Sequence, residues 1–327
     1  MKKVSVRLLV FALLISLAVG LTACFDMDDF SLETTTASTT TPYKRKSFDT
    51  SMYPYFGTLS EKGKDIYSQL YEEIYSGNKS FECKVSCTAE DLTKAIDAVM
   101  NDHPEFFWLD NKYAYTYDPV DGSIKEVTLE FYDFAETPEK LHSAKVKFEQ
   151  ASDAVINQAR LKPTVVEREL YIHNYICQYT SYDESAPYNQ SAYSVLVEHR
   201  SVCAGYSRAF QYLMNKLSIT CYYVTGRTDG LEGGVANVTG EGGSHSWNIV
   251  LIEGQYYNVD CLWNDTASDT YGSPIYPFFN LTDGEFVYHA RVDMAVKLPR
   301  CNGTKFKYSN VFGQTVEAES IVFENAA

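Results

Sequence analysis

The feature that most constrains the fold is the segment 201–217, because its apolar residues recur at the spacing of one helical face. They are Tyr206, Phe210, Leu213, Met214 and Leu217. A helix with such a face has to bury it against the core of its domain. Cys203 falls in the first helical turn, where unpaired backbone N–H groups and the helix dipole favour a thiolate over a thiol. The segment predicts a buried helix with a candidate nucleophile at its start. A small buried hydrophobe is the alternative, since free cysteines are often buried.

A second segment supplies a partner for this cysteine. Runs rich in Ile, Val and Tyr flank Glu253-Gly254 and indicate two strands joined by a two-residue turn. Without a bulge, the turn pairs Ile252 with Gln255, Val250 with Tyr257, Asn248 with Val259 and Trp247 with Asp260. His245 then shares a face with Trp247 and lies diagonal to Asp260, within side-chain reach. An imidazole oriented by a carboxylate is the base half of a nucleophilic triad. The candidate catalytic residues are therefore Cys203, His245 and Asp260.

Three runs together resemble the transglutaminase-like superfamily. They are Ser-Val-Cys-Ala-Gly-Tyr-Ser-Arg-Ala-Phe at 201–210, Ser-His-Ser-Trp-Asn-Ile-Val at 244–250 and Tyr-Tyr-Asn-Val-Asp-Cys-Leu-Trp-Asn-Asp at 256–265. The resemblance covers roughly residues 160 to 310. It implies an α+β fold with a papain-like core, in which the helix carrying the nucleophile packs on an antiparallel sheet. It also implies Cys203 as nucleophile, His245 as base and Asp260 as the residue that orients the base.

The sequence departs from this family at two places. Cys261 stands where the family usually has a small or β-branched residue, which affects no catalytic group. No residue clearly matches the tryptophan that completes the oxyanion hole in animal transglutaminases, and this weighs against a cross-linking activity.

Three aromatic residues are expected to line the substrate cleft. The segment around Tyr182 resembles the aromatic segment that precedes the cysteine helix in the family, so Tyr182 is a candidate oxyanion donor beside the backbone N–H of Cys203. Trp247 and Trp263 flank the expected site, where tryptophan can exclude water from a Cys–His pair. For all three, ordinary core packing is the alternative.

The first 23 residues predict a lipoprotein signal peptide. Lys2, Lys3 and Arg7 precede a short apolar run, and Leu21-Thr22-Ala23 leads directly to Cys24. We expect cleavage before Cys24 and lipidation of its thiol, as by palmitate, which places the chain on the extracytoplasmic face of the cell membrane. Residues 24–48 then form a threonine-rich linker that is too polar to bury a core.

The charge of the chain limits its partners. The formal net charge is -15, and losing three positive charges with residues 1–23 makes it -18. Nucleic acids and anionic lipids both need a positive face, so neither is an expected partner. We expect membrane contact through the lipid anchor alone. The expected substrate is a protein or peptide, with cell-wall peptide among the candidates.

Two regions follow the linker. Residues 49–160 predict a small α+β accessory region without a chemical motif. Its helices are expected at 60–76, after Thr88 and from Thr137-Pro138 to about 160, with a hairpin that turns at 119–122. Residues 161–327 predict the catalytic domain, whose first helix begins at Thr164 and runs to about 179. Its tail from Gly303 suggests short strand-like pieces. The accessory region is equally compatible with an elaboration packed onto the catalytic core.

The remaining cysteines suggest no certain pairing. Phe81, Cys83, Val85 and Cys87 alternate as in a strand, which would keep the two cysteines too far apart for a mutual disulfide. His173 and Cys177 have the spacing of two zinc ligands on a helix, but no second ligand pair is evident, so helix packing is favoured. The glycine-rich segment 227–243 leads into His245 and is expected to be a mobile cleft wall or a simple connection.

The chemistry expected from these residues is amide acyl transfer through a thioester. The Cys203 thiolate attacks a carbonyl, and His245 then protonates the leaving group and activates a second nucleophile. Water would give a peptidase or deamidase, whereas an amine would give an isopeptide cross-link. This cycle needs no metal and no cofactor. The alternative from another class is a surface binding module that keeps the fold without catalysis.

Overall fold

The computed structural model of the chain describes residues 43–228 and 243–318. The predictions for the signal peptide, for Cys24, for the linker up to residue 42 and for most of the glycine-rich segment lie outside these residues. Within the described ranges, no helix is both long enough and apolar enough to cross a membrane.

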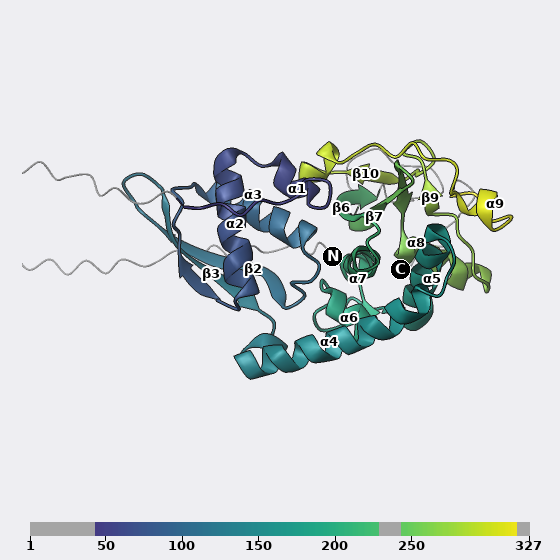
Figure 1. The fold of residues 1–327 in the computed structure, drawn as a ribbon, viewed down its shortest axis with the longest axis horizontal. Helices are drawn as coiled ribbons and strands as arrows, with labels where there is room; N and C mark the ends of the chain where they lie inside the picture. The colour runs from purple at the N-terminus through teal and green to yellow at the C-terminus, as the bar shows by residue number, and fades with distance from the viewer. Residues whose placement is uncertain (1–42, 229–242, 319–327) are drawn as a thin grey trace, which may run out of the picture.

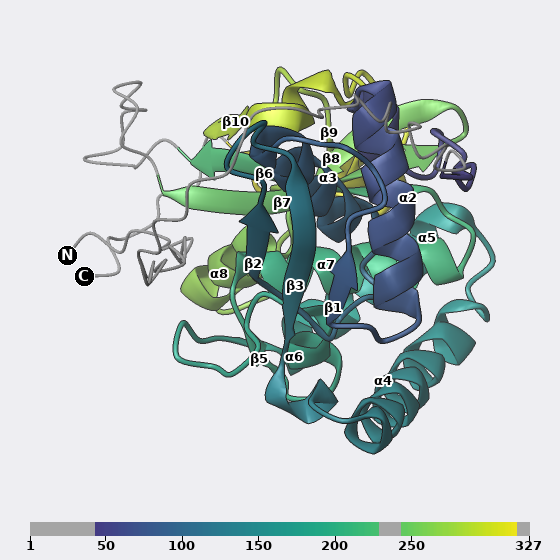
Figure 2. The same cartoon turned by 90° about the vertical axis from the view of Figure 1, so that its left-hand side faces the viewer.

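The N-terminal half consists of helices beside a three-stranded antiparallel sheet of order β1-β3-β2. Its elements are α1 (Pro54–Thr58), α2 (Glu61–Tyr75), β1 (Ser80–Glu82), α3 (Ala89–Asp102), β2 (Leu109–Tyr117) and β3 (Ile124–Phe131). They form the purple and blue half of Figure 1, and Figure 2 shows β2 and β3 side by side. The capping box predicted at Thr88 is present, since Thr88 and Asp91 bond each other's backbone N–H. The predicted helices and hairpin of this half are confirmed.

The strand expected across Phe81–Cys87 is wrong beyond Glu82, where β1 ends. The Gln69 side chain holds the chain at this point, because its amide donates to the Glu82 carbonyl at 2.7 Å and accepts from the Lys84 N–H at 3.0 Å. The chain therefore bends after β1. The separation expected between Cys83 and Cys87 is wrong for the same reason, since their sulfurs lie 3.7 Å apart.

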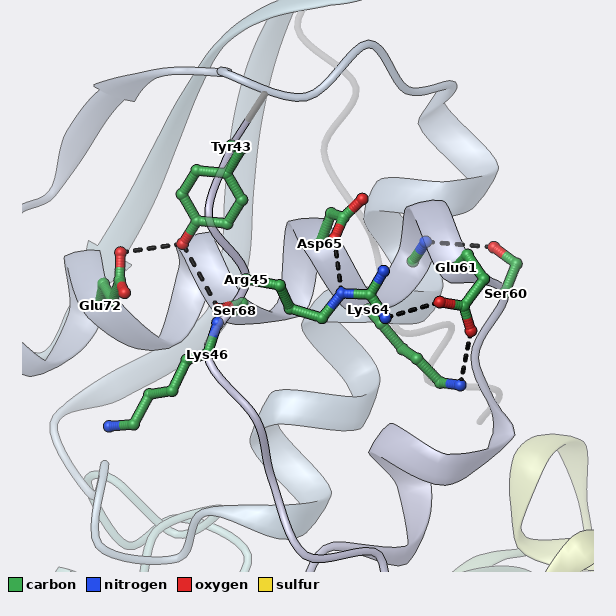
Figure 3. A network of polar contacts seen from close by, with 10 residues as sticks. Tyr43, Arg45, Lys46, Ser60, Glu61, Lys64, Asp65, Ser68 and Glu72 are labelled. Atoms are coloured by element: carbon green, nitrogen blue, oxygen red, sulfur yellow. Dashed lines mark hydrogen bonds and ion pairs between the residues drawn. The ribbon is translucent and has the colours of Figure 1, made fainter. Parts of the chain in front are cut away.

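The start of the described chain lies along α2. Figure 3 shows the contacts, in which Tyr43 bonds Glu72 at 2.8 Å, Lys46 N bonds Ser68 at 2.7 Å, and Arg45 bonds Asp65 at 2.6 Å and Glu61 at 2.7 Å. Ion pairs this close to solvent contribute less than about 1 kcal/mol each. Their combined effect is to fix residues 43–46 along α2.

Two helices that start at threonine caps connect the halves. After the 3₁₀ turn η1 (Asp133–Ala135), α4 (Pro138–Ala159) begins at Thr137, and α5 (Val165–Tyr179) begins at a capping box of Thr164 and Glu167. Both helices were predicted and are confirmed. In Figure 1, α4 runs along the lower edge beneath both halves.

The C-terminal half is built on a five-stranded antiparallel sheet of order β10-β6-β7-β8-β9. Its strands are β6 (Cys221–Thr228), β7 (Ser244–Ile252), β8 (Gln255–Val259), β9 (Phe279–Leu281) and β10 (His289–Arg291). The helix α7 (Cys203–Lys216) packs on β6 and β7, with α5 and α8 (Cys261–Tyr271) beside it; Figure 1 looks along α7. The α+β fold, with the cysteine helix on an antiparallel sheet, is confirmed.

Shorter elements complete this half. They are β4 (Ser181–Tyr182) and β5 (Arg200–Ser201), which pair in parallel, α6 (Ala192–Leu196), the 3₁₀ helix η2 (Asp293–Lys297) and α9 (Tyr308–Val311). The strand-like tail is wrong at Tyr308, which begins a short helix and stacks on Tyr276 with ring centroids 4.0 Å apart. An aromatic stack of this kind fixes the tail by side-chain contact, which alternation in the sequence does not reveal.

The two halves share one continuous hydrophobic core. Tyr55 of α1 is fully buried, and its hydroxyl donates to the backbone carbonyl of Tyr223 in β6 at 2.7 Å. The helix α3 packs against the same strand. The accessory region therefore covers part of the sheet that carries the candidate site.

Candidate active site

Cys203 is the first residue of α7 and is partly exposed, whereas the residues that follow it are buried. Val202 provides no side-chain cap, so the first turn keeps N–H groups that can stabilise negative charge. The helix can start here because Gly205 has no side chain. A Cβ at that position would lie 1.9 Å from Ser201 Oγ and 2.9 Å from Ser194 Oγ.

His245 and Asp260 meet through the β7–β8 hairpin. The structure has the predicted register, with Asn248 opposite Val259 and Ile252 opposite Gln255. His245 Nε2 donates to Asp260 Oδ2 at 2.6 Å, and the other carboxylate oxygen accepts from the backbone N–H of Trp263 at 3.0 Å. Asp260 is thus both the partner of His245 and the N-cap of α8.

The hydrogen bond to Asp260 leaves Nδ1 of His245 for Cys203, with which the imidazole is also hydrogen-bonded. Burial raises the pKa of the Cys203 thiol, but the hydrogen bond and charge of His245, together with a hydrogen bond from Ser246, outweigh burial and the net shift is downward. Burial likewise opposes charge on His245, yet Asp260 and Cys203 raise the pKa of this imidazole to about 10. The Asp260 pKa is lowered, because its two imidazole partners outweigh its burial. Together these shifts favour a thiolate–imidazolium pair at neutral pH.

The three aromatic residues expected in the cleft occupy different positions. Tyr182 on β4 is 53% exposed and lies near enough to Cys203 for the thiolate to raise its pKa slightly, the main cause of its rise to about 12 being burial. Trp263 is partly buried, with its ring 5.5 Å from that of His245. Trp247 is 1% exposed, with its ring centroid 6.2 Å from that of His245, which is the core packing given as the alternative to a place in the cleft. Its place on a central strand beside Phe286 explains this.

His289 is a site residue that the sequence did not reveal. It lies on the edge strand β10, which pairs with β6, and its Nε2 is 3.0 Å from Asp260 Oδ2. Its Nδ1 lies 3.0 Å from the carbonyl of Val287. Both partners are acceptors, so the neutral ring, which has one N–H, satisfies one of them and the imidazolium satisfies both. Burial lowers the pKa of His289 and so favours the neutral ring.

No local sequence pattern identifies His289 as a site residue. Its strand has three residues, and the pairing to β6 spans about sixty positions in the chain. The one available signal is weak, because His289 is one of four histidines, with His173, His199 and His245, in the part of the sequence that resembles the family.

Two clusters of side chains contain residue types that can bind a metal ion. His245, Asp260 and His289 offer ligand atoms within 4.8 Å of one another. The 2.6 Å between His245 Nε2 and Asp260 Oδ2 is a hydrogen-bond distance, whereas two ligands about 2.1 Å from a tetrahedral zinc are about 3.4 Å apart. The donor geometry therefore fits N–H···O bonds.

His173 and Cys177 pack between α5 and α8. His173 Nε2 lies 2.9 Å from the amide nitrogen of Asn264, and the Cys177 thiol donates to the Cys261 carbonyl at 3.3 Å. Burial lowers the pKa of His173 to about 4, so the ring is neutral and accepts the Asn264 amide proton. These contacts are those of helix packing, the interpretation favoured from the sequence.

Residues 153–261 match the family model described as "Transglutaminase-like superfamily", and this confirms the resemblance. Human kyphoscoliosis peptidase is 23% identical over 174 residues, which are 51% of this chain and 26% of that protein. The mouse protein of the same name is 26% identical over 110 residues, covering 32% of this chain and 17% of its own length. A solved structure described as a TGase has 12% identity and a TM-score of 0.31, over 46% of this chain and 50% of its own. The chain thus spans about a quarter or less of the length of these curated relatives.

Proposed function

We propose that this chain is a thiol acyltransferase or hydrolase that acts on amide bonds of peptides or proteins through Cys203, His245 and Asp260. The observation that carries the proposal is the unbroken hydrogen-bonded series from the Cys203 sulfur through His245 to the buried Asp260 carboxylate. The family match over residues 153–261 supports it independently of this geometry.

In the first step the Cys203 thiolate attacks the amide carbonyl carbon and forms a C–S bond. His245, protonated at Nδ1, gives that proton to the leaving nitrogen as the C–N bond breaks, which leaves a thioester and a neutral imidazole. His245 then takes a proton from the second nucleophile as it attacks the thioester carbon, the C–S bond breaks, and the Cys203 thiolate and the protonated His245 are restored. Asp260 keeps the second proton of the ring on Nε2 throughout.

The negative charge that develops on the carbonyl oxygen during the attack has to be stabilised by hydrogen-bond donors. The backbone N–H of Cys203, in the first turn of α7, is one. The Tyr182 hydroxyl is the proposed second, because it is protonated at neutral pH with its pKa raised to about 12, mainly by burial. In the structure this hydroxyl donates to Glu184 at 3.2 Å, so it has to rotate away from Glu184 to serve substrate.

Water is the proposed acceptor, which makes the chain a peptidase or deamidase. The curated relatives carry the name peptidase, and the sequence lacks a clear match to the oxyanion tryptophan of animal transglutaminases. An amine acceptor, giving a cross-link, is the second candidate. The solved structure described as a TGase has the name of that activity.

We further propose that the chain acts at the extracytoplasmic face of the cell membrane, held by a lipid on Cys24 and by the linker that follows. The segment 1–24 supports this by its charged start, short apolar run and small residues before the cysteine. Substrates would then be surface proteins or peptides, with cell-wall peptide among them.

One experiment separates these outcomes. The full chain is incubated with casein, and peptide cleavage, ammonia release and incorporation of dansylcadaverine are measured, with Cys203→Ala as the blank and Cys301→Ser as a matched cysteine control. Cleavage or ammonia without amine incorporation supports the hydrolase, and incorporation supports the cross-linking enzyme. Peptide cleavage, ammonia release and amine incorporation should all disappear in Cys203→Ala.

A second measurement tests the ion pair without a substrate, in case casein is not cleaved. In a Cys83→Ser background, which removes the other cysteine whose pKa is lowered, iodoacetamide labels Cys203 selectively at neutral pH if the ion pair exists, and His245→Ala removes that selectivity. Slow and uniform labelling of all cysteines, together with no turnover, would overturn the enzyme proposal and favour the binding module.

A further inference from the structure

A second pair of reactive groups lies far along the chain from the candidate site. The sulfurs of Cys83 and Cys87 are 3.7 Å apart, in the loop between β1 and α3. Cys83 is partly exposed, whereas Cys87 is 2% exposed. Neither residue has a part in the proposed acyl transfer.

The backbone brings these two residues together. The N–H of Cys83 donates to the Lys125 carbonyl at 2.8 Å, and the carbonyl of Cys87 accepts from the Ile124 N–H at 3.0 Å. Both ends of the loop are therefore anchored to consecutive residues of β3. Gln69 holds the loop from the other side through the Lys84 N–H at 3.0 Å. The closeness of the sulfurs thus follows from ordered backbone and not from chance side-chain positions.

We propose that Cys83 and Cys87 are a redox site that forms a reversible disulfide within this loop. A disulfide has an S–S distance of about 2.05 Å, so the sulfurs need to approach by about 1.7 Å, which is within the reach of side-chain rotation about Cα–Cβ. The Cys83 thiol donates to the Val85 carbonyl at 3.1 Å, and this hydrogen bond is lost when the disulfide forms.

The two cysteines are unequal, and this assigns their roles. The hydrogen bond from Cys87 lowers the pKa of Cys83 to about 7, and the same contact raises the pKa of Cys87. The partly exposed Cys83 is thus the thiolate that attacks an external oxidant, and the buried Cys87 resolves the product.

The reaction balances with a small-molecule disulfide such as oxidised glutathione as the oxidant. The Cys83 thiolate attacks one sulfur, the glutathione S–S bond breaks, and one glutathione thiolate leaves. The Cys87 thiol loses its proton, attacks the Cys83 sulfur and expels the second glutathione thiolate. Counted from the two thiols, and so including the proton that Cys83 releases on ionising, the protein loses two electrons and two protons, which convert the oxidised glutathione into two reduced molecules.

The test uses the full chain with Cys203→Ala, so that the candidate nucleophile cannot form competing disulfides. The protein is reduced, desalted and incubated with excess oxidised glutathione at pH 7, then denatured, alkylated and mapped by peptide mass spectrometry. We expect the peptide carrying residues 83–87 to resist alkylation until dithiothreitol is added. We also expect the oxidised protein to melt a few degrees higher, because the bond constrains the unfolded chain.

Two single variants test the assigned roles. Cys87→Ser should trap glutathione on Cys83 as a stable mixed disulfide. Cys83→Ser should react about tenfold more slowly, because Cys87 is buried and its thiolate fraction is small. Cys301→Ser, at another buried cysteine, should oxidise like the parent protein.

Two results would overturn the proposal. One is full alkylation of both loop cysteines after the oxidant. The other is equal trapping of glutathione in the two single variants. Because Cys203 is absent throughout, neither result depends on the proposed acyl transfer.

Discussion

At the scale of single residues, the charge states of the candidate site depend most on the Asp260 carboxylate. It is 1% exposed and bonds to two imidazoles and to the first turn of α8. A buried carboxylate stays charged only with such partners, since unpaired it would take up a proton. The charge state of His245, and through it that of Cys203, therefore depends on this one side chain.

The reactivity of Cys203 should depend on pH in a specific way. Its pKa is lowered and that of His245 is raised to about 10, so the ion pair exists between those two values. As the pH falls through the Cys203 pKa, the thiolate is protonated and alkylation slows. We expect iodoacetamide to label Cys203 rapidly at pH 6.5, where an ordinary thiol with a pKa of about 8.5 is about 1% thiolate.

The matched variant is His245→Ala. Without the imidazolium, burial and the Asp260 charge both raise the Cys203 pKa against the hydrogen bond from Ser246, and the midpoint of its alkylation curve should move above pH 8.5. An unchanged midpoint in the variant would contradict the ion pair.

His289 should act as a positioning residue for His245. Its N–H to Asp260 keeps the carboxylate ionised and in place. Replacing it with Phe should slow the alkylation of Cys203 at pH 6.5 by about tenfold, an effect typical of residues that orient an active group. His289→Gln can still offer an N–H and should recover part of the rate. If alkylation of Cys203 slows equally in the Gln and Phe variants, His289 contributes packing and not a hydrogen bond.

The difference between the residues that were predicted and those that were not has a physical reason. His245 and Asp260 belong to one hairpin, whose two-residue turn fixes the register, so their contact can be counted along the chain. His289 reaches the same carboxylate through an edge strand that no turn connects to its partner. The sequence left open whether Trp247 lines the cleft or packs in the core, because register gives the face of a strand but not what covers that face.

At the scale of elements, α7 is held against its neighbours by the absence of a side chain at Gly205. Replacing Gly205 with Ala should normally stabilise a helix by about 1 kcal/mol. Here the added Cβ would lie 1.9 Å from Ser201 Oγ and 3.0 Å from the Ser191 carbonyl. We expect Gly205→Ala to lower the free energy of unfolding by about 1–3 kcal/mol, because α7 has to shift.

Chemical denaturation of Gly205→Ala measures this effect, with Gly284→Ala as the control. A Cβ at Gly284 meets nothing within 4 Å, so that variant should change stability by less than about 0.5 kcal/mol. Equal stabilities for the two variants would mean that α7 moves away freely.

Helices were easier to predict than short strands. Those starting at Thr88, Thr137 and Thr164 have local caps and a periodic apolar face, so nearby residues define them. The strand β1 ends after Glu82 because Gln69, from another element, bonds the chain there. Tertiary contacts of this kind leave no trace in a short alternating run.

At the scale of the whole molecule, the two halves should unfold together. They share one core, and the Tyr55 hydroxyl bonds across the boundary to the Tyr223 carbonyl. We expect one calorimetric transition whose van't Hoff enthalpy equals the measured enthalpy. Two separable transitions would contradict this coupling.

The bond across the boundary can be tested directly. Tyr55→Phe leaves the buried Tyr223 carbonyl without that partner and should lower the free energy of unfolding by about 1–3 kcal/mol. Tyr43→Phe, at the solvent-facing contact with Glu72, should cost less than about 1 kcal/mol. Similar losses in the two variants, both small, would mean that the boundary contact is unimportant.

The double use of Asp260, as helix cap and as imidazole partner, affects how this protein can change over evolutionary time. A mutation there exposes the molecule to misfolding and degradation as well as loss of chemistry. Cys203 stands at a partly exposed helix start and supports little else. Descendants that abandon catalysis should therefore discard the thiol early and retain the aspartate, leaving silent paralogues marked by a surviving carboxylate.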